Sequence, residues 1–153
     1  MYDIIIVGAG PAGLTAALYA LRANKKVLIF EASNYGGQII NAAKMENYPG
    51  IKSISGFDYA TELYNQVMDL GAEIKYETVI RIDENKNITG VKIFTGAIYE
   101  AKAVILCTGT YLKARCLCGE AITYTGPNGL QPANHLTDSL LQLGIKIQRF
   151  KTG

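Results

Sequence analysis

The sequence has few histidines and cysteines, which are common metal ligands and catalytic groups. Its 153 residues include one histidine, three cysteines and no tryptophan. The single histidine, His135, has no acid or nucleophile at a recognisable spacing, which makes it a poor general base. Cys116 and Cys118 form a Cys-x-Cys pair, but two ligands without a second cluster do not make a zinc site. We therefore predict no metal site, and the sequence assigns no catalytic residue.

Long apolar runs and export signals are also missing. The apolar run at residues 4–7 is far shorter than the ~20 residues that a membrane-spanning helix needs. The first three residues, Met1-Tyr2-Asp3, contain neither a basic segment nor a signal cleavage site. Three cysteines without a secretory context are typical of a reducing compartment. We expect a cytoplasmic protein with no membrane partner.

A strong excess of charge is absent as well, since the formal net charge is +2. The balance is uneven, because residues 101–153 hold 6 Lys and Arg against 2 acidic residues. This basic third favours a phosphate-bearing partner, but separated charges of this kind are also typical of a solvated surface.

What is present is a repeating pattern of strand and helix. Residues 3–7, which are apolar from Ile4 on, and the apolar run at 27–30 are of the kind found in strands buried within a parallel sheet. Between them, a helical face is predicted from the spacing of Leu14, Ala17, Leu18 and Leu21. A 49% hydrophobic composition suffices for one domain with a core.

The rest of the chain continues in the same α/β style. Ser55 resembles the cap of a second helix, whose buried stripe we predict from Phe57, Ala60, Leu63, Tyr64 and Val67. Further strands are predicted at 73–82, 88–94, 97–107 and 145–150, with a short helix at 134–143.

The strongest chemical signal is the segment Gly8-Ala9-Gly10-Pro11-Ala12-Gly13. It follows a predicted strand and opens a predicted helix, which is the context that a dinucleotide-binding glycine motif requires. The first glycine permits the tight turn, the second lets a pyrophosphate approach the backbone, and the third lets helix and strand pack closely. The helix N-terminus offers free N–H groups to the phosphates.

Glu31 completes this motif at the end of the second strand. Its carboxylate can accept hydrogen bonds from ribose hydroxyls and would repel a 2′-phosphate, so this half-site should reject NADP. The alternative is a solvated acid at a strand end. Because such a carboxylate is not part of a core, we expect Glu31 to affect cofactor affinity and hardly to affect stability.

Residues 1–112 resemble the FAD domain of low-molecular-weight thioredoxin reductases. The resemblance is carried by Gly8–Gly13, Ala20–Asn24, Gly36–Ile39, Glu46–Gly50 and Thr108-Gly109. It implies FAD as the cofactor. The positions that it assigns to FAD binding beyond the glycine motif and Glu31 are Gly36, Gly37, Gln38, Asn47, Val79, Thr108 and Gly109.

Residues 103–153 resemble the glucose-inhibited division protein A family instead. The matching segments are Val104–Leu112 on through Gly119-Glu120, Tyr124–Gly129, Leu136–Leu140 and Arg149–Gly153. This resemblance implies a flavoprotein that takes part in modification of the tRNA wobble uridine, and tRNA as a partner.

The chain lacks the reactive cysteines of both families. It has no Cys-x-x-Cys redox pair and no second glycine motif for NADPH, and Gly36–Gln38 stand where the second family has Cys-Asn-Pro. The Gly-Asp segment that supports the ribityl chain in both families is also missing. The chain therefore resembles the N-terminal portion of a flavoprotein, as a fragment, a split gene product or a small homologue. We interpret Cys116 and Cys118 as small buried packing residues.

Together these patterns predict an α/β, Rossmann-like FAD-binding domain of the glutathione-reductase type, with a parallel sheet and a small antiparallel β-meander. Residues 1–112 would form the FAD-binding core and 113–153 an incomplete extension, the start of a second subdomain. Three functions stay open: an FAD-dependent oxidoreductase reduced by NAD(P)H, part of a tRNA-modifying flavoenzyme, and a non-catalytic FAD-binding remnant. NAD(P)H has no binding site in this chain, and a homodimer or a partner chain is an open alternative.

Overall fold

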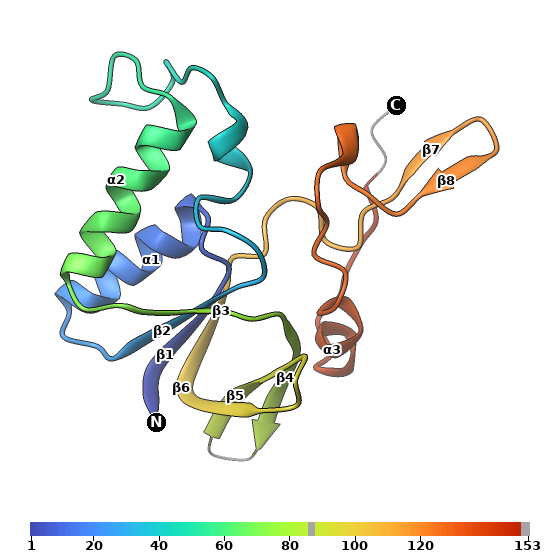
Figure 1. The fold of residues 1–153 in the computed structure, drawn as a ribbon. Helices are drawn as coiled ribbons and strands as arrows, with labels where there is room; N and C mark the ends of the chain where they lie inside the picture. The colour runs from blue at the N-terminus through green and yellow to red at the C-terminus, as the bar shows by residue number, and fades with distance from the viewer. Residues whose placement is uncertain (86–87, 151–153) are drawn as a thin grey trace.

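The structure is a computed structural model that describes residues 1–85 and 88–150. Figure 1 shows the course of the chain through a layered α/β fold with an extension at its C-terminal end. The strands are β1 (Tyr2–Val7), β2 (Val27–Glu31), β3 (Glu73–Tyr76), β4 (Val79–Asn85), β5 (Ile88–Ile93), β6 (Ile98–Leu106), β7 (Cys116–Cys118) and β8 (Ala121–Thr123). The helices are α1 (Pro11–Arg22), α2 (Gly56–Asp69) and α3 (Thr137–Gln142), with short 3₁₀ helices η1 (Gly37–Asn41) and η2 (Pro127–Gly129).

Six strands form one sheet in the order β3-β2-β1-β6-β5-β4. The first four run parallel to one another, whereas β5 pairs antiparallel with both β6 and β4. Strands β3 and β4 are the two edges of this sheet, yet they are joined directly through residues 77 and 78. The sheet must therefore fold back over itself. The bend lies in β6, where Ala101 pairs with both Tyr2 of β1 and Thr89 of β5.

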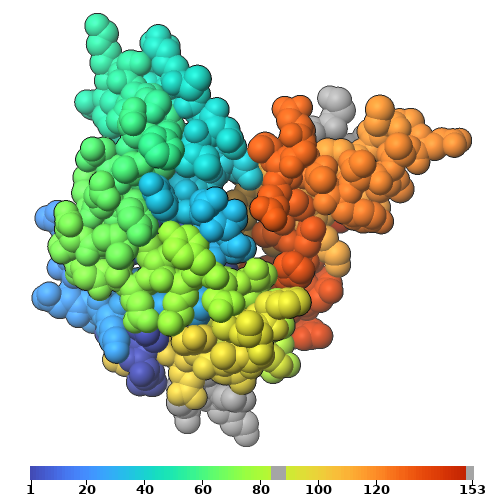
Figure 2. Space-filling view, in the orientation of Figure 1, coloured from blue at the N-terminus to red at the C-terminus, as the bar shows by residue number. Residues whose placement is uncertain are grey.

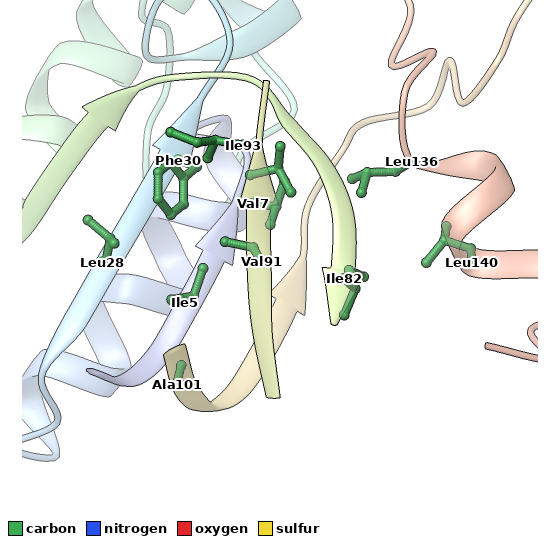
Figure 3. Packing of buried hydrophobic residues seen from close by; sticks show 11 residues of the cluster. Ile5, Val7, Leu28, Phe30, Ile82, Val91, Ile93, Ala101, Leu136 and Leu140 are labelled. Atoms are coloured by element: carbon green, nitrogen blue, oxygen red, sulfur yellow. The ribbon is translucent and has the colours of Figure 1, made fainter. Parts of the chain in front are cut away.

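Folding back produces three layers with two apolar cores. One core lies between the parallel strands and the antiparallel ones. It includes Phe30 of β2, whose ring packs edge-on against that of Tyr99 with the ring centroids 5.1 Å apart. Figure 3 shows side chains of β1, β2, β4, β5 and β6 converging there, with Leu140 of α3 and Leu136 just before this helix approaching from the other side. The other core lies between the parallel strands and the helices α1 and α2. The predicted α/β fold with a parallel sheet and an antiparallel meander is confirmed.

Local sequence explains where the two long helices begin. Pro11 occupies the first turn of α1, where its missing N–H costs nothing. The Oγ of Ser55 accepts a hydrogen bond from the backbone N–H of Asp58 at 3.0 Å and donates one to the Asp58 carboxylate at 2.7 Å. This exchange is the predicted cap of α2, and it satisfies a donor that the helix itself leaves free.

The C-terminal extension makes two different kinds of structure. Helix α3 packs along the edge strand β4, where the Oγ of Ser139 accepts from the N–H of Ile82 at 3.0 Å. The hairpin of β7 and β8, in contrast, projects from the body of the molecule (Figure 2).

Four predictions about elements need correction. The segment predicted as one strand at 73–82 is two strands, because β3 and β4 pair at opposite edges of the sheet. Residues 145–150 are not a strand, and the helix predicted at 134–143 begins only at Thr137. Phe57 is 57% exposed, because the close contact at the start of α2 is made by Gly56 against the carbonyl of Ile39.

Candidate functional site

The turn between β1 and α1 requires glycine at its two ends. Gly8 has φ of +107°, and a Cβ at this position would lie 2.2 Å from the carbonyl oxygen of Cys107. A Cβ on Gly13 would lie 1.8 Å from the carbonyl oxygen of Gly8. Both contacts are far inside van der Waals distance, so side chains at these positions would force the strand and the helix apart. The tight turn predicted for Gly8 and the close helix–strand packing predicted for Gly13 agree with this geometry.

The middle glycine of the motif lies beside open space. The nearest atoms to a Cβ built on Gly10 are the carbonyl oxygen of Gly36 and the Cα of Gly37, both at 4.0 Å. Helix α1 starts at the next residue with no side-chain cap and no acidic residue in its first turn. The N–H groups of its first turn, including those of Ala12 and Gly13, have no acceptor within the helix. Together with the helix dipole they make this end of α1 suited to an anion.

A second glycine-rich segment contacts this turn. The N–H of Gly36 donates to the carbonyl oxygen of Ala9 at 2.8 Å, and a Cβ on Gly37 would lie 3.3 Å from the Cα of Gly10. Gly36 and Gly37 both have positive φ, at +91° and +58°. The structure thus brings the two predicted glycine segments together, although Gly36 lies 23 positions after Gly13 in the sequence.

Glu31 contacts the same turn from the end of β2. Its Oε2 accepts from the N–H of Ala9 at 2.8 Å, and its Oε1 accepts from the N–H of Ser33 at 3.0 Å. Each carboxylate oxygen has a second lone pair, so these bonds leave acceptor capacity for a ligand. The bond to Ala9 is one that sequence reasoning missed, because it joins residues 22 apart through the sheet.

The remaining predicted cofactor-binding residues do not all lie beside the Gly8–Gly13 turn. Thr108 and Gly109 follow the end of β6, and the backbone nitrogen of Thr108 lies 3.6 Å from a Cβ built on Gly8. Gln38 in η1 and Asn47 are exposed, whereas the side chain of Val79 is 5% exposed and belongs to the apolar core. No hydrogen bond within the described part of the chain joins these last three residues to the Gly8–Gly13 turn.

A cluster of tyrosines beside Glu31 was not anticipated. The rings of Tyr35 and Tyr64 stack with their centroids 4.2 Å apart. Partial burial, together with the phenols of Tyr64 and Tyr35 and the Glu31 carboxylate, raises the pKa of Tyr76. These tyrosines are scattered through the sequence, and no motif links them, so only the fold could reveal that they meet.

Groups for covalent or acid–base catalysis are not gathered here. Burial raises the pKa of the Cys107 thiol, which makes it a weaker nucleophile at neutral pH. His135 is exposed. Within residues 1–85 and 88–150, no three His, Cys, Asp or Glu side chains are close enough to hold a metal ion. The same residues contain no helix with the length and apolar character needed to cross a membrane.

The two ends of the chain match different families of known proteins. The family model described as glucose inhibited division protein A matches residues 58–153, which is well over half of the chain. This chain belongs to that family. A second model, described as FAD dependent oxidoreductase, matches residues 3–76. Both resemblances noted in the sequence are confirmed, and both families support a flavin cofactor.

Individual relatives show the same division. The tRNA uridine 5-carboxymethylaminomethyl modification enzyme MnmG of Lachnoclostridium phytofermentans is 38% identical, covering 99% of this chain and 31% of the relative. The thioredoxin reductase of Treponema pallidum is 45% identical, covering 78% of this chain and 39% of the relative. The crystal structure of thioredoxin reductase from Streptococcus pyogenes matches with a TM-score of 0.70 and 42% identity, over 78% of this chain and 38% of that one. The chain thus spans less than two fifths of the length of these relatives.

Proposed function

We propose that this chain binds FAD along the line from Glu31 through Gly10 to the Gly36-Gly37 segment. The observation that carries the proposal is the contact between two glycine segments beside an uncapped helix N-terminus. A mononucleotide needs only one such segment. Two segments in contact, with a ribose-binding carboxylate at one end, suit a dinucleotide that extends across both.

In this arrangement the residues of the chain bind and orient the cofactor. The first-turn N–H groups of α1 would hold the pyrophosphate, and the free lone pairs of Glu31 would accept from the adenosine ribose. Gln38 and Asn47 are exposed polar side chains on the segment beyond Gly37, where they can serve the flavin end. Thr108 and Gly109 would close the site beside Gly8, and the backbone at Val79 would serve the adenine. Residues 1–112 form the binding unit in this proposal, and 113–153 its extension.

The reaction that this site supports best is flavin-dependent oxidoreduction. FAD supplies hydride-transfer chemistry when it is bound. The chain contributes position and electrostatics, because the carboxylate described at the site, Glu31, is assigned to the ribose and burial raises the pKa of the nearby Cys107 thiol. We propose that NAD(P)H serves as reductant through a site outside this chain, since the sequence has no second glycine motif.

Calorimetric titration of the chain with FAD, FMN and ADP tests the binding proposal. FAD should bind more tightly than FMN, which lacks the adenosine that Glu31 addresses. The matched variant is Gly10→Ala, because its Cβ meets no atom closer than 4.0 Å but enters the space assigned to the pyrophosphate. Its FAD affinity should fall while its fold is kept. Equal FAD affinity for wild type and Gly10→Ala would refute the site.

Reduction is tested separately, with NADH and NADPH added to the FAD-loaded chain under anaerobic conditions. Loss of the oxidised flavin absorbance supports an active oxidoreductase. Flavin that binds tightly and stays oxidised supports the alternative that the chain is a non-catalytic FAD-binding remnant.

A second candidate function is participation in tRNA wobble-uridine modification. The family match over residues 58–153 favours it, as do the 6 basic residues against 2 acidic ones in 101–153. The absence of the family's Cys-Asn-Pro segment, whose place is taken by Gly36–Gln38, argues against this candidate. The alignment with the Lachnoclostridium relative spans 194 positions and this chain has 153 residues, so at least 41 positions have no counterpart here. An electrophoretic mobility-shift assay tests this candidate. Binding of unmodified tRNA that persists at moderate salt, where binding of a random RNA is lost, would support it.

A further inference from the structure

The projecting hairpin places two thiols on one face. Cys116 and Cys118 are alternate residues of β7, so their side chains point to the same side of the hairpin. Their partners across the hairpin, Thr123 and Ala121, are small and lie on that face too. The apolar pair Leu117 and Ile122 occupies the opposite face. The two thiols therefore share an uncrowded surface with no bulky neighbour between the strands.

Exposure and orientation distinguish these thiols from packing residues. Cys118 is exposed and Cys116 is half-buried, which corrects the prediction that both are buried. The thiol of Cys116 donates to the carbonyl oxygen of Thr125 at 3.4 Å, which holds it at the base of the hairpin. Both thiols are free, and neither is joined in a disulfide.

The spacing suits a bridging cation better than a disulfide. Alternate residues of a strand have Cα atoms about 6.4–6.8 Å apart, at the upper end of the range that a disulfide spans without distortion. An S–S bond is only ~2.05 Å long. Two metal–thiolate bonds of ~2.3 Å each, placed end to end, bridge roughly 4.6 Å and need no movement of the backbone.

The donor set decides which cation fits. Zinc in a structural site takes four ligands, and no third His, Cys, Asp or Glu joins the two thiols among the residues described. Thiolates alone select soft ions, of which Cu⁺ is the one that two sulfur ligands suit. We propose that Cys116 and Cys118 form a two-coordinate site for a single Cu⁺ ion. On binding, two S–H bonds break, two Cu–S bonds form and two protons pass to solvent, with no change of oxidation state.

The test is anaerobic titration of the reduced, full 153-residue chain with Cu⁺ supplied as its bicinchoninate complex, followed through the loss of that complex's visible absorbance. One Cu⁺ per chain should transfer to the wild type. Cys116→Ser and Cys118→Ser should each lose this transfer. The matched control is Cys107→Ser, which removes a thiol elsewhere in the chain and should keep it. Circular dichroism confirms that each variant is folded.

Three results would overturn the proposal. Transfer that survives in either hairpin variant would show that the pair does not act together, and transfer lost in folded Cys107→Ser would place the ion elsewhere. Addition of excess Zn²⁺ gives an independent readout, because a two-coordinate soft site should retain Cu⁺. Displacement of Cu⁺ by Zn²⁺ would show a site with more ligands than this hairpin provides and would equally refute it.

Discussion

The Oε2 atom of Glu31 accepts a hydrogen bond from the N–H of Ala9 at 2.8 Å, which ties the end of β2 to the turn between Gly8 and Gly10. Ala9 is fully buried, so its N–H has no access to water. The carboxylate assigned to the ribose therefore also fixes the loop assigned to the phosphates. Binding and local folding depend on the same side chain.

The sequence alone predicts hardly any effect of Glu31 on stability, and the bond to Ala9 corrects this: Glu31→Ala should have two measurable effects. Without cofactor, urea unfolding should show a loss of about 1–3 kcal/mol, because the buried N–H of Ala9 loses its acceptor. FAD affinity of the folded variant should fall roughly ten- to a hundredfold, the equivalent of a charge-assisted hydrogen bond worth about 1.5–3 kcal/mol. Glu31→Gln keeps one acceptor oxygen, so its losses of stability and of FAD affinity should both be smaller. Unchanged stability and affinity in Glu31→Ala would remove Glu31 from both roles.

Gly13→Ala and Gly10→Ala form a matched pair for the turn itself. The added methyl group on Gly13 would lie 1.8 Å from a backbone oxygen, so the backbone must move, at a cost of about 1–3 kcal/mol or more. Gly10 has φ of −75°, which alanine adopts without strain, and its methyl group meets no close atom. The unfolding free energy of Gly10→Ala should stay within about 0.5 kcal/mol of the wild-type value. Chemical denaturation without cofactor measures both, and equal losses would contradict the geometry described.

The parts of the molecule that the sequence predicts well are those whose geometry is settled within a few residues. The Gly8–Gly13 turn needs only a strand before it and a helix after it. The cap of α2 needs only Ser55 and Asp58. In each case the residues that make the contacts are neighbours in the chain, so residue type and spacing contain the information.

The parts that escaped prediction depend on contacts between distant segments. The Glu31–Ala9 bond requires β1 and β2 to be paired in register. Helical periodicity placed Phe57 on the buried stripe of α2, but the period does not say how far the layer beneath the helix extends. Residues 145–150 have the composition of a strand, but they pair with no strand of either sheet, and composition alone does not show whether a pairing partner is present.

Ser139→Ala should weaken the attachment of the extension to the body. Ser139 Oγ accepts from the Ile82 N–H at 3.0 Å, on the side of β4 that has no neighbouring strand. Removing the hydroxyl leaves this buried N–H without a partner, at a cost of about 1–3 kcal/mol. Gln142→Ala on the same helix is the control, because Gln142 is exposed and should change stability by less than about 0.5 kcal/mol. Hydrogen exchange at Ile82 should accelerate only in the Ser139 variant, and similar exchange in both would argue against the contact.

Tyr2→Phe should change how the stability of the sheet depends on pH. The Tyr2 hydroxyl donates to the Glu73 carboxylate at 2.6 Å and so joins the start of β1 to the start of β3. This bond is the main cause that lowers the pKa of Glu73 from its ordinary 4.5, and it raises the pKa of Tyr2 from 10.0 to about 12. A lowered carboxyl pKa adds stability above the unfolded value of 4.5, which is lost as the pH falls through the folded pKa.

The raised phenol pKa acts with the opposite sign, since its contribution is complete below 10.0 and is lost as the pH rises through about 12. Between pH 4.5 and pH 10.0 the wild type should therefore be more stable than Tyr2→Phe by a constant amount. At lower and at higher pH the difference in stability should shrink. Because the bond is exposed, the difference should stay below about 1 kcal/mol. Carboxyl-carbon NMR titration of Glu73 gives the sharper measurement: its pKa should move back toward 4.5 in Tyr2→Phe, and a Glu73 pKa that stays low in the variant would assign the shift to Lys75 instead.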